Sequence, residues 1–191
     1  MAADIQAALD LSPPVHSPTA RPPGRPRPAS QTFAALLPLL PQFQGISEAR
    51  VHAALPYLQE WSVPPGAKVF EEGSTDRSCF IIVRGSVEVC IERTGQRRRL
   101  AQFGPGRSIG ELGLFDDLPR NVTCIATEPT VLLELSRTRF GTLRTMEPPS
   151  ATALMHTLNR SLADSVALAY ATLRPLTPGS LDVPPLPGHS T

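Results

Sequence analysis

The feature that most constrains the fold is a run of short alternating segments between Trp61 and Ser136, most of them closed by a glycine turn. In segments such as 87–91, apolar and polar residues alternate, which is the period of a strand with one buried face. Turns at Gly85 and Gly95 are typical of the breaks between them. Many short strands with this punctuation favour a β-sandwich or a jelly roll. The expected strands cover 68–70, 79–83, 87–91, 97–103, 122–126 and 131–135.

Helical periodicity replaces the strand pattern on both sides of this run. Before it, apolar residues recur at helical spacing over 33–43, and Ser47 is a good N-cap for a second short helix over 48–55. After it, prolines at 148–149 interrupt a short helix, and the longest helical pattern covers 151–173. The apolar stripe of that last helix consists of Leu154, Leu158, Leu162, Val166 and Ala169 with Tyr170. The expected fold class is α+β, mainly β: a jelly-roll-like β-roll of about eight strands, with short N-terminal helices and a long C-terminal helix.

The 22 prolines cluster at the two ends of the chain and set its boundaries. Proline at this density removes backbone donors and favours extended polyproline II, and neither end has an apolar face to bury. Residues 1–30 are expected to form a disordered leader, with a basic Pro-rich ligand for a partner or a loose nucleic-acid tether as the alternatives, and 174–191 a disordered tail. One folded unit is expected over 31–173, with the roll at 61–136 and the C-terminal helices at 137–173.

The net charge limits the classes of partner that the chain is expected to bind, and the cysteines indicate the redox state of its compartment. A net charge of +1 and a pI of about 7.8 imply neither nucleic acid nor membrane as a bulk electrostatic partner. Cys79, Cys90 and Cys124 occur singly in apolar runs, which is typical of reduced, buried thiols. We see no targeting segment and no apolar stretch long enough to span a bilayer, so the expected location is the cytoplasm.

Catalytic and metal chemistry find little support in the sequence. The four histidines lie in the tails or on expected helices, whereas a metal-binding β-roll needs histidines clustered on strands. No nucleophile-elbow motif accompanies a suitably placed histidine. The triplet Arg97-Arg98-Arg99 follows a hairpin turn and is interpreted as a solvated hairpin, with a nucleic-acid contact as the alternative. We therefore expect neither an enzyme nor a metal site.

The stretch 110–123 carries the candidate binding chemistry. Glu111 opens an expected short helix, and the first backbone N–H groups of that helix, at 112–114, are expected to be free to attract an anion. Arg120 adds a charged fork that suits phosphate. A carboxylate beside a phosphate is unfavourable unless it serves another group, and Glu111 can accept from a sugar hydroxyl. The pair predicts recognition of a phosphate joined to a sugar; a surface ion pair worth about 0–1 kcal/mol is the alternative.

Four stretches together resemble one known family: Val63–Gly73, Phe80–Val89, Phe103–Leu112 and Pro119–Thr123. Their glycine turns and phosphate cassette occur in the order of the cyclic nucleotide-binding domain. That domain is found in bacterial catabolite-activator-type regulators, kinase regulatory subunits and cyclic-nucleotide-gated channels. The resemblance covers about residues 33–173 and implies a β-roll that binds a cyclic nucleotide.

The resemblance also implies roles for individual residues. In that family the cassette glutamate binds the ribose 2′-hydroxyl and the cassette arginine binds the cyclic phosphate, which correspond to Glu111 and Arg120. Amides around Gly113 and Val122 complete the phosphate cradle. The implied ligand site consists of Gly110, Glu111, Leu112, Gly113, Arg120, Asn121 and Val122. The final helix of the family closes over the base as a lid and forms the seam of dimeric regulators, which corresponds to 151–173.

The chain departs from the family pattern directly after the arginine. Asn121 and Val122 stand where the family usually has Ser, Ala or Thr followed by Ala. The first position influences the preference between cAMP and cGMP, and valine adds bulk beside the phosphate. No DNA-binding module follows the long helix, so direct DNA binding is not expected.

Two hypotheses from different functional classes result. In the first, the chain is a non-catalytic regulatory domain in signal transduction. It senses a cyclic nucleotide, cAMP in preference to cGMP, and signals through the helix at 151–173 to a separate effector protein, with a homodimer through that helix as an option. In the second, the pocket has lost its affinity and the roll is a protein-interaction module. Neither hypothesis involves a membrane, or a cofactor other than the ligand.

Overall fold

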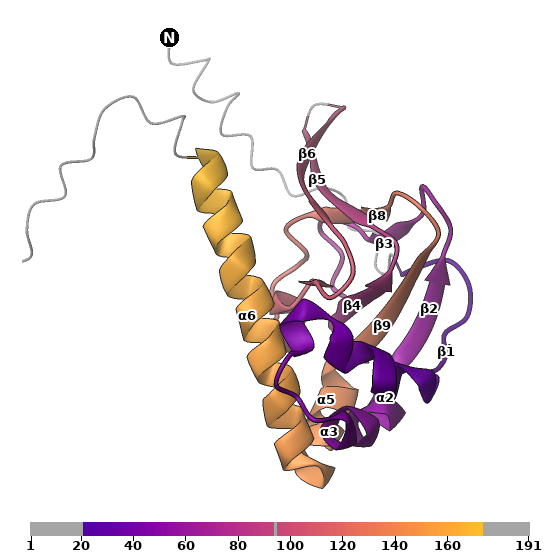
Figure 1. Cartoon of the computed structure of the whole chain (residues 1–191). Coiled ribbons are helices and arrows are strands. Elements are labelled where there is room, and N and C mark those ends of the chain that lie inside the picture. Colours follow the sequence, from indigo (N-terminus) through magenta and orange to yellow (C-terminus); the bar gives the residue numbers. More distant parts are fainter. Residues whose placement is uncertain (1–20, 94, 174–191) are drawn as a thin grey trace, which may run out of the picture.

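The chain folds into two antiparallel β-sheets that form a roll, with helices packed against one side of it (Figure 1). The computed structural model describes residues 21–93 and 95–173. One sheet has the strand order β1-β2-β9-β4-β7 and the other β3-β8-β5-β6. The strands are β1 (Arg27–Pro28), β2 (Gln59–Val63), β3 (Lys68–Phe70), β4 (Ser78–Arg84), β5 (Val87–Arg93), β6 (Gln96–Phe103), β7 (Ser108–Ile109), β8 (Thr123–Ala126) and β9 (Thr130–Ser136). The helices are α2 (Thr32–Leu36), α3 (Glu48–Ala54), α4 (Leu112–Phe115), α5 (Arg137–Met146) and α6 (Pro148–Leu173), and the expected fold class is confirmed.

Two apolar cores lie on opposite faces of the five-stranded sheet. Strand β4 shows how they share one element: Phe80 and Ile82 belong to the core inside the roll, whereas Cys79 and Ile81 belong to the core beneath the helices. Successive side chains of a strand point to opposite faces, so a strand buried on both sides needs a continuous apolar run. The helices contribute Val51, Ala54, Phe140, Leu143, Ala151, Leu154 and Leu158 to the second core.

The first N-terminal helix is shorter than its periodicity predicts. Helix α2 has five residues, and two single 3₁₀ turns, Leu37–Leu39 and Pro41–Phe43, replace its continuation. Pro38 and Pro41 lack an N–H group, so an α-helix cannot continue through them. Helix α3 begins after Ser47 as predicted, although the serine side chain makes no capping hydrogen bond.

Helix α6 begins at the proline pair rather than after it. Pro148-Pro149 occupies the first turn, where backbone N–H groups have no helical partner in any case. The first half of the helix is packed into the core as far as Leu158, whereas Val166 is half exposed. The helix therefore leaves the core and runs along the side of the roll (Figure 1).

The far end of α6 is described only in part. The side chains at 169–170, predicted to extend the apolar stripe, lie outside the described residues. No helix in the described ranges, α6 included, combines the length and the hydropathy that crossing a bilayer requires.

A short strand lies where the sequence predicts a disordered leader. Strand β1 pairs antiparallel with β2, which places Arg27 opposite Glu60 and Pro28 opposite Gln59. It forms the edge of the five-stranded sheet, a position in which a strand tolerates proline. The sheet thus extends into the predicted leader. The predictions for 1–20 and for the tail at 174–191 fall outside the described residues.

The three cysteines are free and buried, as their isolated positions in apolar runs predict. Burial raises the pKa of the thiols of Cys79, Cys90 and Cys124 above the ordinary value for cysteine. Raised pKa values keep the thiols protonated and poorly nucleophilic, so these cysteines act as small core residues.

The contact between Trp61 and Glu134 provides a test of the sheet packing. Trp61 Nε1 donates a 2.7 Å hydrogen bond to Glu134 Oε2, and both side chains are buried. We expect Trp61→Phe to lower the free energy of unfolding by about 2–3 kcal/mol, because it removes the donor and leaves a buried carboxylate short of a partner. Urea unfolding followed by circular dichroism measures the loss. The control is Glu128→Gln at an exposed position, and a loss for Trp61→Phe no larger than the control's would contradict this packing.

Candidate functional site

All seven residues that the resemblance implies for a ligand site line one cavity. Its volume is about 580 Å³, and its walls come from the β5–β6 hairpin, the α4 region, the start of β8 and helix α6. A concavity of this size is typical of small-molecule sites. The seven residues are Gly110, Glu111, Leu112, Gly113, Arg120, Asn121 and Val122. The fold therefore brings residues 110–113 and residues 120–122 together around one cavity. The role of each residue in binding a ligand stays a prediction.

The guanidinium of Arg120 is buried and held by the protein itself. Its Nε and Nη2 donate to the two carboxylate oxygens of Asp76 at 3.2 and 2.5 Å, which is the bidentate geometry of a strong ion pair. Nη1 donates to the Gly110 carbonyl at 2.8 Å, and Nη2 also donates to the Ser78 carbonyl at 2.5 Å. The Phe70 ring lies 4.2 Å from the guanidinium carbon. Of the five N–H donors of the group, one, on Nη1, has no hydrogen-bond partner among the described residues.

No sequence motif marks Asp76 as part of this arrangement. Asp76 lies 44 residues before Arg120, in the loop that leads into β4, and no local pattern links the two. The backbone reinforces the link, because Arg120 N donates to the Ser74 carbonyl at 2.8 Å and Gly73 N donates to the Arg120 carbonyl at 2.7 Å. Arg120 is therefore less available to an anion than its place in the sequence suggests, because most of its N–H donors already bind the protein.

Glu111 is the second buried charged residue of the cavity, with 7% of its surface exposed. Ser108 Oγ donates a 2.6 Å hydrogen bond to Glu111 Oε1. Ser108 is in turn joined to α6, because its N–H donates to Ser161 Oγ at 3.1 Å and its carbonyl accepts from the same hydroxyl at 3.3 Å. The predicted sugar-binding carboxylate is thus one side chain away from the long helix.

The expectation of three free amides at the start of α4 is wrong for two of them. Gly113 N donates to the Gly110 carbonyl and Leu114 N to the Glu111 carbonyl, both at 3.0 Å. The chain forms tight turns before the helix begins, and α4 is only four residues long. A helix this short also has little macrodipole. Of the three amides, that of Leu112 alone has no hydrogen-bond partner among the described residues, and it remains with the Nη1 donor of Arg120 to attract an anion.

Two glycines leave room for the guanidinium. Gly110 has a φ of +76°, and a Cβ there would stand 2.4 Å from Arg120 Nη1 and 3.0 Å from the Phe70 ring. A Cβ on Gly113 would stand 2.6 Å from the same nitrogen and 3.1 Å from the Ser78 carbonyl oxygen. Because Arg120 is fixed by Asp76 and two carbonyls, it cannot move aside cheaply. Glycine at both positions therefore serves the arginine as well as any ligand.

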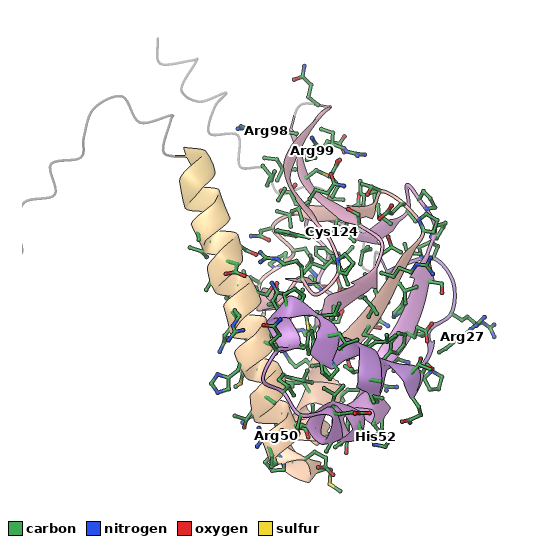
Figure 2. The ribbon with its side chains drawn as sticks, viewed as in Figure 1. Arg27, Arg50, His52, Arg98, Arg99 and Cys124 are labelled. Atoms are coloured by element: carbon green, nitrogen blue, oxygen red, sulfur yellow. The ribbon has the colours of Figure 1, made fainter. Side chains whose placement is uncertain are left out.

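The other walls of the cavity are apolar, with two cations on the hairpin. Phe70, Val89 and Cys124 are buried lining residues, and burial holds the pKa of the Cys124 thiol well above its usual value. Arg98 and Arg99 of β6 also line the cavity and are exposed (Figure 2). Arg97 instead pairs with Glu88 at 2.6 Å. The triplet is solvated as predicted, but its place beside the cavity was not foreseen.

The part of the chain that the structure describes contains no candidate metal-binding site. Within 21–93 and 95–173, no three His, Cys, Asp or Glu side chains gather in a way that would hold a metal ion. Among the described residues, Glu111 and Asp116 are the carboxylates that line the cavity. Glu111 accepts from Ser108 and Asp116 from the backbone N–H of Asp117, while Asp76 is engaged by Arg120.

Comparisons with known proteins show which family the chain resembles. Residues 60–147 match the family model described as the cyclic nucleotide-binding domain. Over 126 residues the chain is 32% identical to the Cyclic AMP receptor protein of Thermus thermophilus, an alignment that covers 65% of this chain and 58% of that protein. Over 98 residues it is 33% identical to the cAMP-dependent protein kinase regulatory subunit of Yarrowia lipolytica, covering 51% of this chain and 25% of that one. The chain thus spans little more than half of the first relative and a quarter of the second.

Solved structures show the same fold. A cyclic nucleotide-binding domain from Methylobacillus flagellatus superposes with a TM-score of 0.71 at 23% identity, covering 82% of this chain and 91% of that one. The Thermus thermophilus Catabolite Activator Protein superposes with a TM-score of 0.57 at 32% identity, covering 70% and 63% of the two chains. The resemblance predicted from the sequence is confirmed.

The pair of Asp76 and Arg120 predicts a large stability effect for a single charge. We expect Asp76→Asn to lower the free energy of unfolding by about 3 kcal/mol, because it leaves a buried guanidinium without its counter-charge. Asp117→Asn is a matched control, since Asp117 also pairs with arginines, Arg77 and Arg137, but is 72% exposed. The control should cost less than about 1 kcal/mol. Urea unfolding compares the two, and equal losses would contradict the structural role given to Asp76.

A series of Gly→Ala variants separates backbone strain from steric conflict at the cavity. Gly66 has a φ of +79° with nothing within 4 Å of an added Cβ, so Gly66→Ala carries strain alone, about 1 kcal/mol. Gly113→Ala carries the conflict alone and should cost about 2 kcal/mol. Gly110→Ala carries both and should cost about 3 kcal/mol. Thermal unfolding ranks the three, and a loss for Gly110→Ala no greater than for Gly66→Ala would show that Arg120 is not fixed beside it.

Proposed function

We propose that the chain is a non-catalytic sensor of a cyclic nucleotide, because residues 60–147 of its β-roll match the model of the cyclic nucleotide-binding domain. The observation that carries the proposal is the position of Glu111 and Arg120. Both are buried, both line the same cavity of about 580 Å³, and both stand in the order that the family cassette requires. A carboxylate for a sugar hydroxyl beside a cation for a phosphate is a combination that a cyclic nucleotide needs.

The donors and acceptors in the cavity suit the parts of such a ligand. Glu111 accepts from the ribose 2′-hydroxyl, while the remaining Nη1 donor of Arg120 and the Leu112 amide face the cyclic phosphate. The purine lies against the apolar wall that includes Val89 and Phe103. The preferred ligand is cAMP rather than cGMP, since the Cyclic AMP receptor protein and the cAMP-dependent protein kinase regulatory subunit, two proteins to which the chain is similar, are both named for cAMP.

The signal passes from the ligand to α6 through two serines. A ribose hydroxyl that binds Glu111 changes the acceptor available to Ser108, and Ser108 holds Ser161 of α6 through two hydrogen bonds. Leu162 and Ser165 of the same helix line the cavity. The ligand therefore stabilises one position of α6 over another, which is the requirement for a switch. The helix reports to a separate effector protein or to a second copy of this chain, in the cytoplasm and without direct DNA contact.

A second candidate function is a protein-interaction module that binds no nucleotide. Four of the five N–H donors of Arg120 are already used inside the protein. Beside the cavity, Leu118 and Leu112 are exposed, and Leu118 exposes 71% of its surface. Val122, where the family has a smaller residue, also lines the cavity. These features favour apolar contact with a partner over tight phosphate binding.

Calorimetric titration with matched ligands tests the sensor. We expect wild-type protein to bind cAMP more tightly than cGMP and not to bind 5′-AMP, which lacks the cyclic phosphate. Glu111→Gln should weaken cAMP binding about tenfold, as should 2′-deoxy-cAMP with the wild type, because either change removes the charge-assisted hydrogen bond between the Glu111 carboxylate and the 2′-hydroxyl. Combining the two should therefore give no further loss.

The control for this cycle is Glu128→Gln, an exposed carboxylate outside the cavity, which should bind cAMP as the wild type does. Losses that add in the combined experiment would show that Glu111 does not contact the 2′-hydroxyl. The absence of heat with either cyclic nucleotide would instead favour the interaction module.

A further inference from the structure

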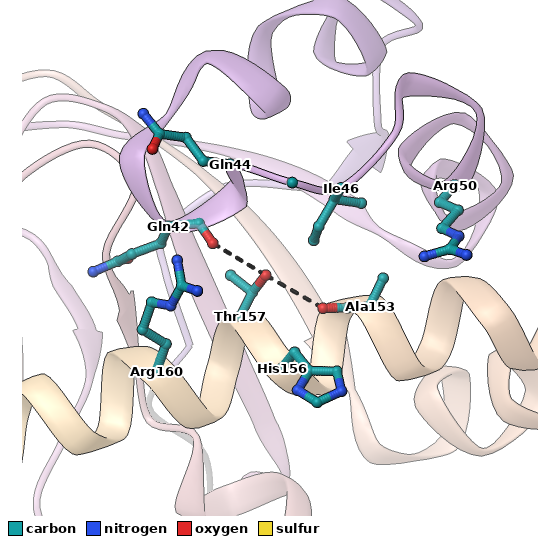
Figure 3. A pocket seen from close by; sticks show the side chains of 9 residues that line it. Gln42, Gln44, Ile46, Arg50, Ala153, His156, Thr157 and Arg160 are labelled. Carbon is teal, nitrogen blue, oxygen red and sulfur yellow. Dashed lines mark hydrogen bonds between the residues drawn. The ribbon is translucent and has the colours of Figure 1, made fainter.

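A second, smaller cavity lies on the other side of α6, away from the proposed nucleotide site. Its volume is about 200 Å³, and it is formed between the segment from Gln42 to Arg50 and one face of α6 (Figure 3). The lining residues from α6 are Ala153, His156, Thr157 and Arg160. None of the residues around this cavity lines the larger one. Its volume is below the usual range for drug-sized ligands, which suits an ion or a very small metabolite.

The cavity is lined by basic side chains and by none that are acidic, among the residues described. Arg50 comes from α3, and His156 and Arg160 lie four residues apart on one face of α6 (Figure 3). No ion pair is formed by Arg50 or Arg160 within the described ranges. The nearest acid along the helix, Asp164, is taken by Arg107 at 2.7 Å. Within the described part of the chain, no acidic side chain therefore neutralises Arg50 or Arg160.

The same cavity contains a buried acceptor that lacks a partner. Gln42 has only 8% of its surface exposed, and its Oε1 receives no hydrogen bond from the described part of the chain. The rest of the residue is engaged, since Nε2 lies 3.4 Å from Asp164 Oδ2 and the Gln42 carbonyl accepts from Thr157 Oγ1 at 3.3 Å. A buried acceptor without a donor is costly. Oε1 is itself fully buried, so the Gln42 amide must turn toward the cavity before the O–H group of a ligand can remove that cost.

We propose that this cavity binds a hydrogen-bearing phosphate group, either free phosphate or the phosphoryl group of a small metabolite. Guanidinium groups match phosphate oxygens in charge and geometry, and Arg50 and Arg160 approach from two different elements. Near neutral pH free phosphate carries at least one proton and part of a phosphomonoester keeps one, which gives the O–H donor that Gln42 Oε1 lacks. The bound group ties the N-terminal segment to α6. The proposal does not depend on nucleotide binding in the larger cavity.

Titration of inorganic phosphate into the nucleotide-free full chain tests the site. At constant ionic strength in chloride, we expect saturable heat with one phosphate per chain and a rise in the unfolding temperature. The double variant Arg50→Gln/Arg160→Gln should bind about tenfold more weakly, because it removes both guanidinium contacts. Arg144→Gln removes an exposed arginine of α5 that lies away from the cavity, and it should bind as the wild type does.

Two further ligands identify the chemistry and its source. Sulfate has the size and charge of phosphate but carries no proton near neutral pH, so it should bind more weakly if Gln42 Oε1 accepts from the ligand. Glycerol phosphate should bind more tightly than inorganic phosphate if the natural ligand is a metabolite, and less tightly if it is free phosphate.

Phosphate binding that persists in the double variant would place the ion elsewhere and overturn the proposal. So would equal losses in the double variant and in Arg144→Gln, or equal affinity for sulfate and phosphate. If the double variant does not fold by circular dichroism, His156→Gln at an exposed position provides the same comparison, with a weaker affinity expected.

Discussion

The binding face of the roll depends on one buried ion pair, between Asp76 and Arg120. Removing two charges from water is expensive, and the attraction between them repays this only with good geometry and further hydrogen bonds. Here the carboxylate of Asp76 accepts from two N–H groups along one edge of the guanidinium, and the carbonyls of Gly110 and Ser78 accept from two more. The pair thus joins the loop before β4 to the α4 region and sets the floor of the cavity. It also leaves Arg120 with one N–H donor for an anion, counted against the described residues.

Much of the fold could be predicted from the sequence, because the alternation of apolar and polar residues in a strand is visible within a few neighbouring residues. The alternation in β5 and the glycine turns at Gly85 and Gly95 are visible without any tertiary information. Strand β7 was not predicted, because two residues are too few to show a period. Strand β1 was not predicted because a proline-rich segment reads as disordered, and only the edge of an existing sheet gives it a partner.

The candidate site could be predicted in its residues but not in its state. Glu111 and Arg120 stand in a recognisable order, and the structure places them around one cavity. The sequence could not reveal which protein side chains already bind Glu111 and Arg120 in the absence of a ligand. Asp76 and Ser108 reach the site from other loops, and these contacts depend on how the whole roll closes. The same reason explains why the cavity-lining role of Arg98 was not foreseen.

Helix α6 connects the two cavities physically. Thr157 and Ser161, one turn apart and both buried, contact Gln42 on one side and Ser108 on the other. Two hydrogen-bonding residues near the middle of α6 therefore hold the helix in place, and a ligand in either cavity could shift its exposed second half by changing these contacts. Such an arrangement couples two sites only if each ligand favours the same or opposite positions of the helix.

Hydrogen–deuterium exchange with and without saturating cAMP tests most directly whether the larger cavity is a nucleotide site that controls α6. The predicted result is slower exchange of the backbone amides at 110–122 and around Ser161, with α5 unchanged. Exchange that stays the same throughout the chain, or that slows only in segments outside the cavity, would contradict a nucleotide-sensing role.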